Sequence, residues 1–311
     1  MPKQRIRFIS YTSITMKVLS LFDGMACWYE ALQRAGIPIE RYYASEIDKY
    51  AIQIAKKNHP DIIEIWDVCK VKWEDYQDID LLIWGSPCQW FSMAGKMLNF
   101  DDPRSKLFFE YVRVLKEVKP KYFLLENVKM KKEYQDKISE LIGVQPIEID
   151  SALVSWQRRK RLYRTNIPGV IQPEDKGIMV KDILEEYAPA KYDLSEKGLK
   201  MLRRNFGSKG QSINFDPKIL FKMTYPSVCE QQEWLDRKSP TLCAAMGTGW
   251  WNVPGLVYQN RIRKLTPIEC ERLQTLPDNY TAGISDSQRY KMLGNWWTVD
   301  VIAHIFRFIT A

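Results

Sequence analysis

The chain has 311 residues, of which 45% are apolar and 27% are charged, a balance that is ordinary for a soluble globular protein and excludes a disordered chain. Its six cysteines are scattered without a C-x-x-C pair and it has only two histidines, so neither a disulfide framework nor the usual zinc spacing is available and we expect no bound metal. The formal net charge of +8 at pH 7 is compatible with a polyanionic partner, although many basic proteins bind no such partner.

Residues 1–15 are expected to be an N-terminal extension outside the fold. They contain basic residues but no sustained apolar core, so they do not resemble a signal peptide. The sequence has no run of about 18 apolar residues, which is the length that a membrane-spanning helix needs. We therefore expect a cytoplasmic protein that has no membrane contact and acts as a monomer.

Residues 16–170 alternate short apolar runs with amphipathic stretches of helical period, which is the pattern of β-α-β units. This pattern predicts an α/β domain with a doubly wound, mostly parallel sheet. We expect its strands at 16–22, 41–47, 63–68, 79–84, 121–126, 146–154 and 161–167. The helices of this domain are expected at 28–35, 48–58, 105–118 and 131–142.

Residues 171–260 differ from the first domain in composition. They are richer in turns, poor in clear periodicity and basic in patches such as 200–204, which predicts a smaller, irregular second domain. Residues 261–311 regain a helical pattern and are expected to return to the first domain. Their helices are expected at 266–276, 285–293 and 298–309.

Polar residues follow the first two predicted strands. Phe22, Asp23 and Gly24 form a tight turn after strand one, and Glu46 and Ile47 end strand two. An acid about 20 residues past the first turn is where nucleotide-binding α/β folds bind ribose hydroxyls. The turn lacks G-x-G-x-x-G, however, and acids at strand ends are commonly helix N-caps, so both interpretations stay open.

A cysteine and a glutamate follow two later strands. Pro87 and Cys88 lie in a loop directly after an apolar strand, and Glu126 begins the sequence E-N-V at the end of strand five. A thiolate is a strong nucleophile and a nearby carboxyl group can act as a general acid. The alternatives are a buried structural cysteine and a helix cap, both of which are commoner.

The segment before the last strand is basic. Alternate residues of a strand share a face, so Gln157, Arg159 and Arg161 should point together. Three donors on one face suit an anion or a polarised carbonyl. The alternative is a basic edge exposed to solvent.

The order of these motifs is similar to that of the DNA cytosine-5 methyltransferase family of bacteria and phages. The resemblance covers nearly all of residues 16–311, and the joint order of the short motifs is far more specific than any one of them. The motifs are F-x-G (22–24), an acid (46), D-V (67–68), P-C-Q (87–89), E-N-V (126–128), Q-x-R-x-R (157–161), R-x-L-T-P-x-E-x-x-R-L-Q (263–274) and G-N (294–295).

The resemblance implies a Rossmann-like fold and methyl transfer from S-adenosylmethionine to carbon 5 of cytosine. Cys88 would attack carbon 6 of a base flipped out of the duplex, and Glu126 would hold ring nitrogen 3 and the exocyclic amine. Arg159 and Arg161 would steady the base carbonyl and the catalytic loop. The cofactor would be bound by Phe22, Asp23, Gly24, Glu46, Ile47, Asp67, Val68, Pro87, Asn295 and Val299.

The same resemblance implies double-stranded DNA as the partner, with sequence specificity in roughly 172–258. A separately encoded restriction endonuclease is a further candidate partner, as in restriction-modification systems. Two other functions stay open, namely a tRNA cytosine methyltransferase and a catalytically inactive DNA-binding protein. The expected DNA-contacting residues are Gln89, Ser92, Gln157, Thr241 and Leu242.

Tryptophan stands at several positions where the family usually has glycine or another small residue: Trp28, Trp66, Trp84, Trp90, Trp156, Trp250 and Trp296. Either the fold has lost its activity, or a UGA codon that means glycine in this gene was translated as tryptophan. Replacing these seven of the 11 tryptophans would raise glycine from 15 to 22 residues, about 7% of the chain, which is the usual share. Since the catalytic motifs are otherwise intact, we favour mistranslation.

Overall fold

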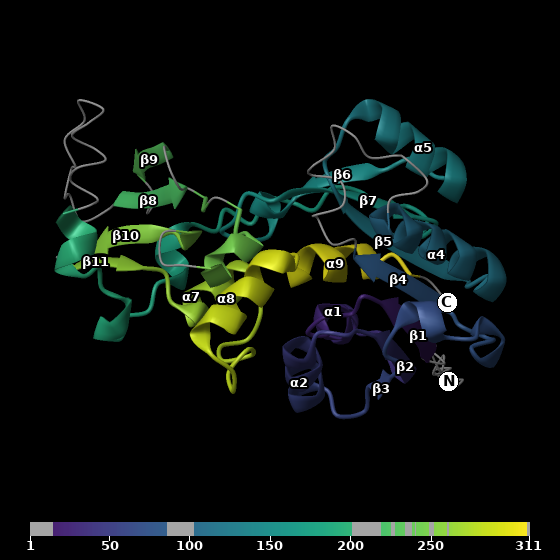
Figure 1. Cartoon of the computed structure of the whole chain (residues 1–311). Helices are drawn as coiled ribbons and strands as arrows, with labels where there is room; N and C mark the ends of the chain where they lie inside the picture. The colour runs from purple at the N-terminus through teal and green to yellow at the C-terminus, as the bar shows by residue number, and fades with distance from the viewer. Residues whose placement is uncertain are drawn as a thin grey trace, which may run out of the picture.

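The computed structural model describes residues 15–85, 103–200, 219–224, 228–233, 238–239, 241–248, 252–259 and 261–309. Two lobes lie side by side, a larger one around a seven-stranded sheet and a smaller one around a four-stranded sheet (Figure 1). The predicted site residues Pro87, Cys88, Gln89 and Ser92 lie outside the described residues.

The larger sheet is mostly parallel and confirms the predicted α/β fold. Its strand order is β3-β2-β1-β4-β5-β7-β6, and β7 is antiparallel to both of its neighbours. The strand order reverses between β1 and β4. From β1 the chain continues through β2 to β3 at one edge of the sheet, and from β4 it continues toward the other edge. The strands are β1 (Met16–Leu21), β2 (Ile39–Ser45), β3 (Ile63–Glu64), β4 (Leu81–Gly85), β5 (Tyr122–Val128), β6 (Ile147–Asp150) and β7 (Lys160–Thr165).

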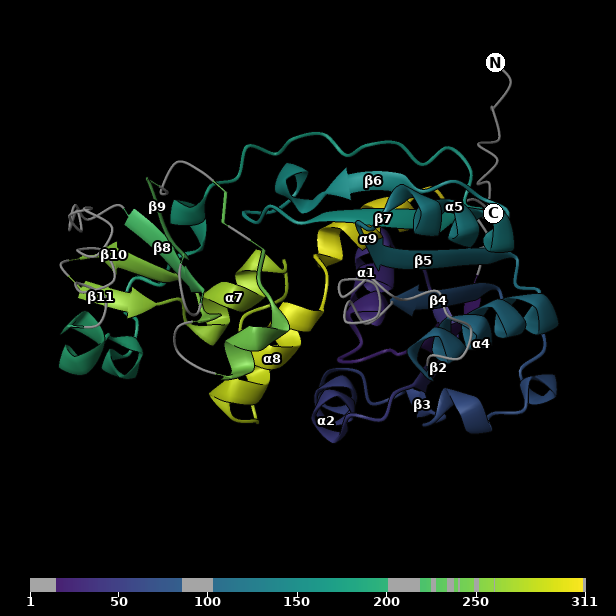
Figure 2. The same ribbon diagram turned by 45° about the horizontal axis from the view of Figure 1, so that its top comes forward.

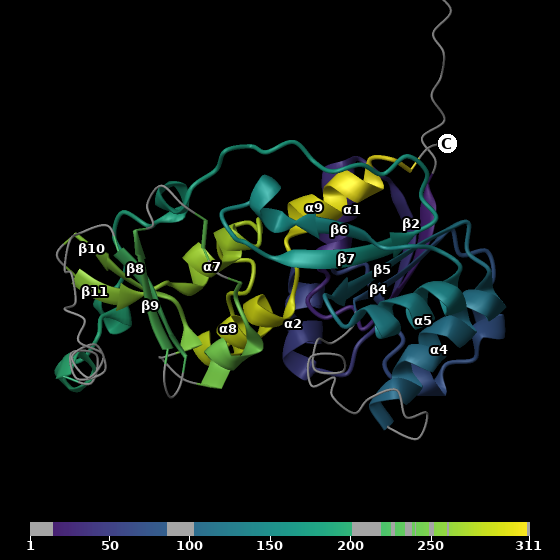
Figure 3. The same cartoon turned by 90° about the horizontal axis from the view of Figure 1, so that it is seen from above.

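Helices cover both faces of this sheet, as Figure 3 shows. Along each strand the side chains alternate between the two faces: Val18 and Ile83 join one buried cluster, and Leu19 and Leu82 join the other. The first face is covered by α1 (Cys27–Ala35), α2 (Lys49–Asn58) and α9 (Val299–Phe306), and the second by α4 (Pro103–Val118) and α5 (Lys132–Ile142).

Strand β3 is shorter than the sequence predicts. Pairing with β2 ends at Glu64, and the chain then turns through Trp66, whose φ of 59° is left-handed. Asp67 next accepts a hydrogen bond from the backbone N–H of Cys69 (3.0 Å) and caps a short 3-10 turn. A side chain that accepts a hydrogen bond from a nearby backbone N–H replaces the bond which that N–H would make in a sheet, so the strand ends there. A pattern of apolar residues alone does not reveal such a bond.

The smaller lobe contains an antiparallel sheet in the order β11-β10-β8-β9. The sequence pattern predicted no regular structure here, because short strands separated by turns give little periodicity. Figure 2 shows this sheet beside α7 and α8, at the far end of the molecule from β2 and β3. The strands are β8 (Ile219–Thr224), β9 (Val228–Glu233), β10 (Gly255–Tyr258) and β11 (Arg261–Lys264).

The C-terminal segment runs from the smaller lobe back to the larger one. It contains α7 (Pro267–Leu273), α8 (Asp286–Asn295) and α9, which packs on α1 and is joined to it by an ion pair between Arg34 and Asp300 (2.9 Å). Helix α7 begins with a capping box, in which Thr266 and Glu269 each bind the other's backbone N–H. Among the described residues, no helix combines the length and apolarity needed to cross a membrane.

Candidate active site

The turn after β1 is fixed by the carboxylate at the end of β2. Gly24 has a φ of 61°, and its backbone N–H donates to Oε2 of Glu46 (2.8 Å). The other oxygen of Glu46 accepts from the N–H groups of Ile47 (2.7 Å) and Asp48 (2.8 Å). Burial raises the pKa of Glu46, and these three N–H groups oppose the increase. The structure therefore brings together two neighbouring strand ends that the sequence predicted to share a ligand.

Asp23 belongs to this turn, and its side chain is fully buried. Its Oδ1 accepts a hydrogen bond from the hydroxyl of Tyr42 (2.5 Å). Burial raises the pKa of Asp23 to about 7, because the charged form loses its hydration. Phe22, at the start of the turn, packs its ring against Trp84 with the centroids 5.9 Å apart.

The segment after β3 contains a second carboxylate, Asp67, next to a residue that is hydrogen-bonded to the end of β2. Asp67 is partly exposed, and the hydroxyl of Ser45 donates to the carbonyl of Trp66 (2.6 Å) just before it. Ile47 is 75% exposed and Trp66 is 58% exposed, so apolar side chains border the two acids, whereas Val68 is buried. Carboxylates beside exposed apolar groups suit a ligand with hydroxyls and a flat ring, such as a nucleoside.

Glu126 lies at the centre of the larger sheet, in register with Gly85 of β4. It is buried, and its Oε1 forms an ion pair with Nε of Arg161 on β7 (2.9 Å). Burial raises the pKa of Glu126, while Arg161 and Arg159 act in the opposite direction. A carboxyl group whose pKa is raised keeps its proton up to a higher pH than an exposed one. Cys88 follows Gly85 by three residues in the sequence.

The segment before β7 alternates between the interior and solvent, as predicted. Gln157 and Arg159 are buried, whereas Arg158 between them is exposed. The guanidinium of Arg159 donates to the carbonyls of Leu242 (2.8 Å) and Gly294 (3.3 Å). This arginine therefore joins three segments that are distant in the sequence, and the alternative of a solvent-exposed edge does not apply to it.

Gln157 and Leu242 lie against each other inside the protein. Oε1 of Gln157 accepts from the N–H of Leu242 (2.8 Å), and Leu242 is itself buried. Thr241 is partly exposed, and its hydroxyl donates to the carbonyl of Arg158 (2.7 Å). Gln157 and Leu242 thus position the backbone next to Thr241, and a role in contacting DNA stays a prediction for all three.

Gln274 is a positioning residue to which the sequence motif gave no role. Its Nε2 donates to the carbonyls of Leu293 (2.7 Å) and Trp296 (3.0 Å), and its backbone carbonyl accepts from the N–H of Val299 (3.0 Å). These bonds fix the turn between α8 and α9. Val299 is buried and Asn295 is partly buried, both at this turn, so the structure brings them to the side of the β1 turn.

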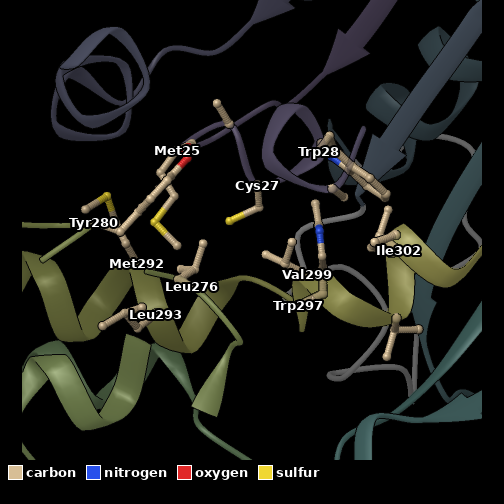
Figure 4. Close-up of a cluster of buried hydrophobic side chains, with 14 of the residues drawn as sticks. Met25, Cys27, Trp28, Leu276, Tyr280, Met292, Leu293, Trp297, Val299 and Ile302 are labelled. Atoms are coloured by element: carbon tan, nitrogen blue, oxygen red, sulfur yellow. Dashed lines mark hydrogen bonds between the residues drawn. The ribbon is translucent and has the colours of Figure 1, made fainter. Parts of the chain in front are cut away.

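The seven tryptophans that stand where the family usually has glycine or another small residue, called the suspect tryptophans below, have different environments. Trp28 and Trp84 are fully buried, and Trp156 is partly buried against the core. Figure 4 shows Trp28 of α1 and Trp297, which lies between α8 and α9, close together, and their ring centroids are 4.1 Å apart. Trp296, the residue before Trp297, lies over Gly24. Trp66 is largely exposed, and the other two, Trp90 and Trp250, lie outside the described residues.

S-adenosylmethionine fits only part of this site. The carboxylates of Glu46 and Asp67 suit ribose hydroxyls, but the space over Gly24 is filled by the indole of Trp296. Within the described residues no group of three or more His, Cys, Asp or Glu side chains could hold a metal ion.

Comparisons with known proteins agree with this architecture. The family model described as C-5 cytosine-specific DNA methylase matches residues 16–142 and 153–311. The type II methyltransferase M1.ScrFI of Lactococcus lactis subsp. cremoris is 33% identical, over 92% of this chain and 76% of its own length. The type II methyltransferase M.NlaX of Neisseria lactamica is 30% identical, over 93% of this chain and 94% of its own.

Solved structures show the same fold at lower identity. S. pombe Dnmt2 methyltransferase has a TM-score of 0.70 at 20% identity and covers 94% of this chain and 97% of its own. A prophage-encoded putative DNA modification methyltransferase of E. coli has a TM-score of 0.67 at 20% identity, and the match covers 94% of this chain and 98% of that chain. With two strand-end acids, the buried glutamate–arginine pair and a family match across almost the whole chain, the protein belongs to the C-5 cytosine-specific DNA methylases, which are DNA (cytosine-5)-methyltransferases.

Proposed function

We propose that the protein methylates carbon 5 of cytosine in double-stranded DNA through a covalent bond between the base and Cys88. The observation that carries the proposal is the buried pair of Glu126 and Arg161, in register with Gly85 at the start of the Cys88 loop. The pair presents a carboxyl group that can hold a proton and a cation that limits how far its pKa rises.

The proposed chemistry begins with the Cys88 thiolate forming a bond to carbon 6 of a cytosine that has been flipped out of the duplex. Electron density then moves from the carbon 5–carbon 6 double bond toward ring nitrogen 3, where Glu126 supplies a proton. S-adenosylmethionine, when bound, supplies the methyl group that carbon 5 takes. Carbon 5 then loses its proton to solvent, and the electron pair of that bond re-forms the carbon 5–carbon 6 double bond as the sulfur–carbon bond breaks. Cys88 leaves as a thiolate, and ring nitrogen 3 returns its proton to Glu126.

Arg159 and Arg161 differ in this proposal. Arg161 contacts Glu126 directly and keeps it oriented toward the base. Arg159 places its charge near the same carboxyl while its guanidinium binds the carbonyls of Leu242 and Gly294. We propose that Arg159 holds the recognition segment, roughly 172–258, at the catalytic centre.

The test is transfer of tritiated methyl from S-adenosylmethionine to mixed-sequence duplex DNA, with tRNA as the alternative acceptor. It compares the protein as printed with a version carrying glycine at the seven suspect tryptophan positions. We expect transfer to duplex DNA from the glycine version. Transfer to tRNA alone would overturn the DNA substrate, and salt-sensitive DNA binding without any transfer would indicate a DNA-binding protein instead.

The same assay, applied to single variants, tests the role of Cys88. Cys88→Ala should abolish both transfer and the covalent adduct with DNA containing 5-fluorocytosine. Glu126→Gln should slow transfer by about two to four orders of magnitude with cofactor affinity nearly unchanged, because Glu126 acts on the base. An adduct that persists in Cys88→Ala would exclude this cysteine as the nucleophile.

A further inference from the structure

The strand order identifies one crevice where a ligand should bind. In open α/β sheets, ligands bind outside the carboxyl ends of the strands at the point where the strand order reverses. Here that point lies between β1 and β4. The turn after β1 contains Gly24, and β4 ends at Gly85. Two glycines at this position would leave the backbone open to a ligand, since neither carries a side chain.

Tryptophan rings lie on both glycines instead. A Cβ atom on Gly24 would be 1.6 Å from Cζ2 and 2.0 Å from Cη2 of Trp296. A Cβ atom on Gly85 would be 1.9 Å from Cζ3 and 2.1 Å from Cη2 of Trp297. Both contacts are with the six-membered part of an indole, so each ring packs directly against the glycine backbone. The two side chains together fill the crevice from the β1 side to the β4 side.

The rings support each other through aromatic contacts. Trp296 and Trp297 meet edge to face, with centroids 4.8 Å apart and planes at 86°. Trp297 also packs on Trp28 of α1, with the two ring centroids 4.1 Å apart. Within the described residues, the buried indole N–H groups of Trp28 and Trp297 have no hydrogen-bond acceptor. The cluster is thus held by ring packing and not by polar contacts.

The backbone of Trp296 is anchored on both sides. Its N–H donates to the carbonyl of Met292 (3.1 Å), and its carbonyl accepts from Nε2 of Gln274 (3.0 Å). The peptide groups on either side of the ring are therefore fixed, and the side chain extends toward Gly24. For the crevice to open, the indole must rotate away while its backbone stays in place.

We propose that Trp296 occupies the place of the methyl donor and determines whether this chain binds S-adenosylmethionine. The inference rests on the proposed function for the identity of the ligand. The carboxylates of Glu46 and Asp67 are both partly exposed and can still receive ribose hydroxyls. Removing the indole opens the space over Gly24 and leaves the anchored backbone unchanged.

The experiment measures S-adenosylmethionine binding by isothermal titration calorimetry on three proteins: the chain as printed, Trp296→Gly and Trp156→Gly. Trp156 is a matched control, since it is also a half-buried indole packed on the core, and its ring is not among the nearest atoms to Gly24 or Gly85. If the open form of the printed chain is populated at about 1%, Trp296→Gly binds about 100-fold more tightly, and Trp156→Gly matches the printed chain. Trp296→Ala tests the same opening if the glycine variant unfolds.

Equal affinity of the printed chain and Trp296→Gly would overturn the inference, and so would the absence of binding to both position-296 variants. A gain in affinity that Trp156→Gly shares would also overturn it, because general loosening would then be the cause. Failure of the proposed function looks different. A Trp296→Gly protein that binds S-adenosylmethionine but transfers no methyl group to DNA would leave the inference standing and refute the activity.

Discussion

At the scale of single residues, burial decides the protonation of the acids around the candidate site. Glu126 and Glu46 each gain hydrogen bonds or an ion pair that oppose the effect of burial on the pKa. Asp23 has only neutral hydroxyl partners, and burial raises its pKa to about 7. The group is therefore close to half-protonated at neutral pH in the folded protein.

Asp23 should make the free energy of unfolding depend on pH. In the unfolded chain the carboxyl releases its proton near its ordinary pKa of 3.8, whereas in the folded protein it does so near 7. The folded state thus holds the extra proton in this window, so stability falls as the pH rises from about 4 to 7, by up to about 4 kcal/mol, and levels off above 7. Asp23→Asn keeps an oxygen acceptor for Tyr42 and removes the titration.

Urea unfolding of Asp23→Asn and the parent protein at pH 4.5, 6 and 8 would measure this effect. We expect the variant to gain stability relative to the parent as the pH rises to 7. Glu64, whose pKa burial also raises to about 7, is present in both proteins, so the difference retains only its repulsion of Asp23, which is part of the Asp23 effect. A difference that does not change between pH 4.5 and 8 would refute the assignment.

At the scale of elements, the C-terminal segment fastens α2 to the turn after β1. Nζ of Lys57 on α2 donates to the carbonyls of Asn279 (3.0 Å) and Ala282 (3.0 Å). Between them, the hydroxyl of Tyr280 donates to the carbonyl of Met25 (2.8 Å) and contacts Nε2 of His59 (3.2 Å). Burial lowers the pKa of His59 to about 4, so this contact involves a neutral imidazole at pH 7.

Tyr280→Phe should loosen the turn at Met25. Tyr290→Phe is the matched control, because its buried hydroxyl also donates to a backbone carbonyl, that of Leu265 (2.6 Å), in the smaller lobe. Each variant should lose about 1–3 kcal/mol of stability, since a buried carbonyl loses its donor. Only Tyr280→Phe should speed hydrogen exchange in peptides covering 22–28. Equal exchange in the two variants would show that Tyr280 has no specific role at the turn.

At the scale of the whole molecule, the unusual tryptophans occur in both halves of the sequence and in unrelated environments. Trp66 has a left-handed φ of 59°, a conformation that glycine adopts without strain, whereas Trp28 on α1 and Trp84 on β4 are fully buried. A single structural role cannot explain positions that differ so much. Mistranslation of one codon would affect them all alike.

We expect UGA codons in the gene at the seven suspect positions and UGG at the four other tryptophans. Mass spectrometry of peptides from the native source should then show glycine at these seven positions. UGG at Trp28, Trp66 and Trp296 would contradict mistranslation and would make the indole over Gly24 a genuine feature of the protein.

The amino-acid sequence by itself determined the α/β class, the approximate positions of the strands of the larger sheet apart from the end of β3, and the acids that follow them, because strand and helix periodicity and turn chemistry are local properties. It also predicted that Gln157 and Arg159 point to the same side, whereas only the structure showed that this side is buried. Only the tertiary structure decided the strand order, the antiparallel β7 and the pairing of Glu126 with Arg161, since these depend on which distant segments meet. The crowding of Trp296 on Gly24 is likewise a contact across more than half the chain, which no local pattern encodes.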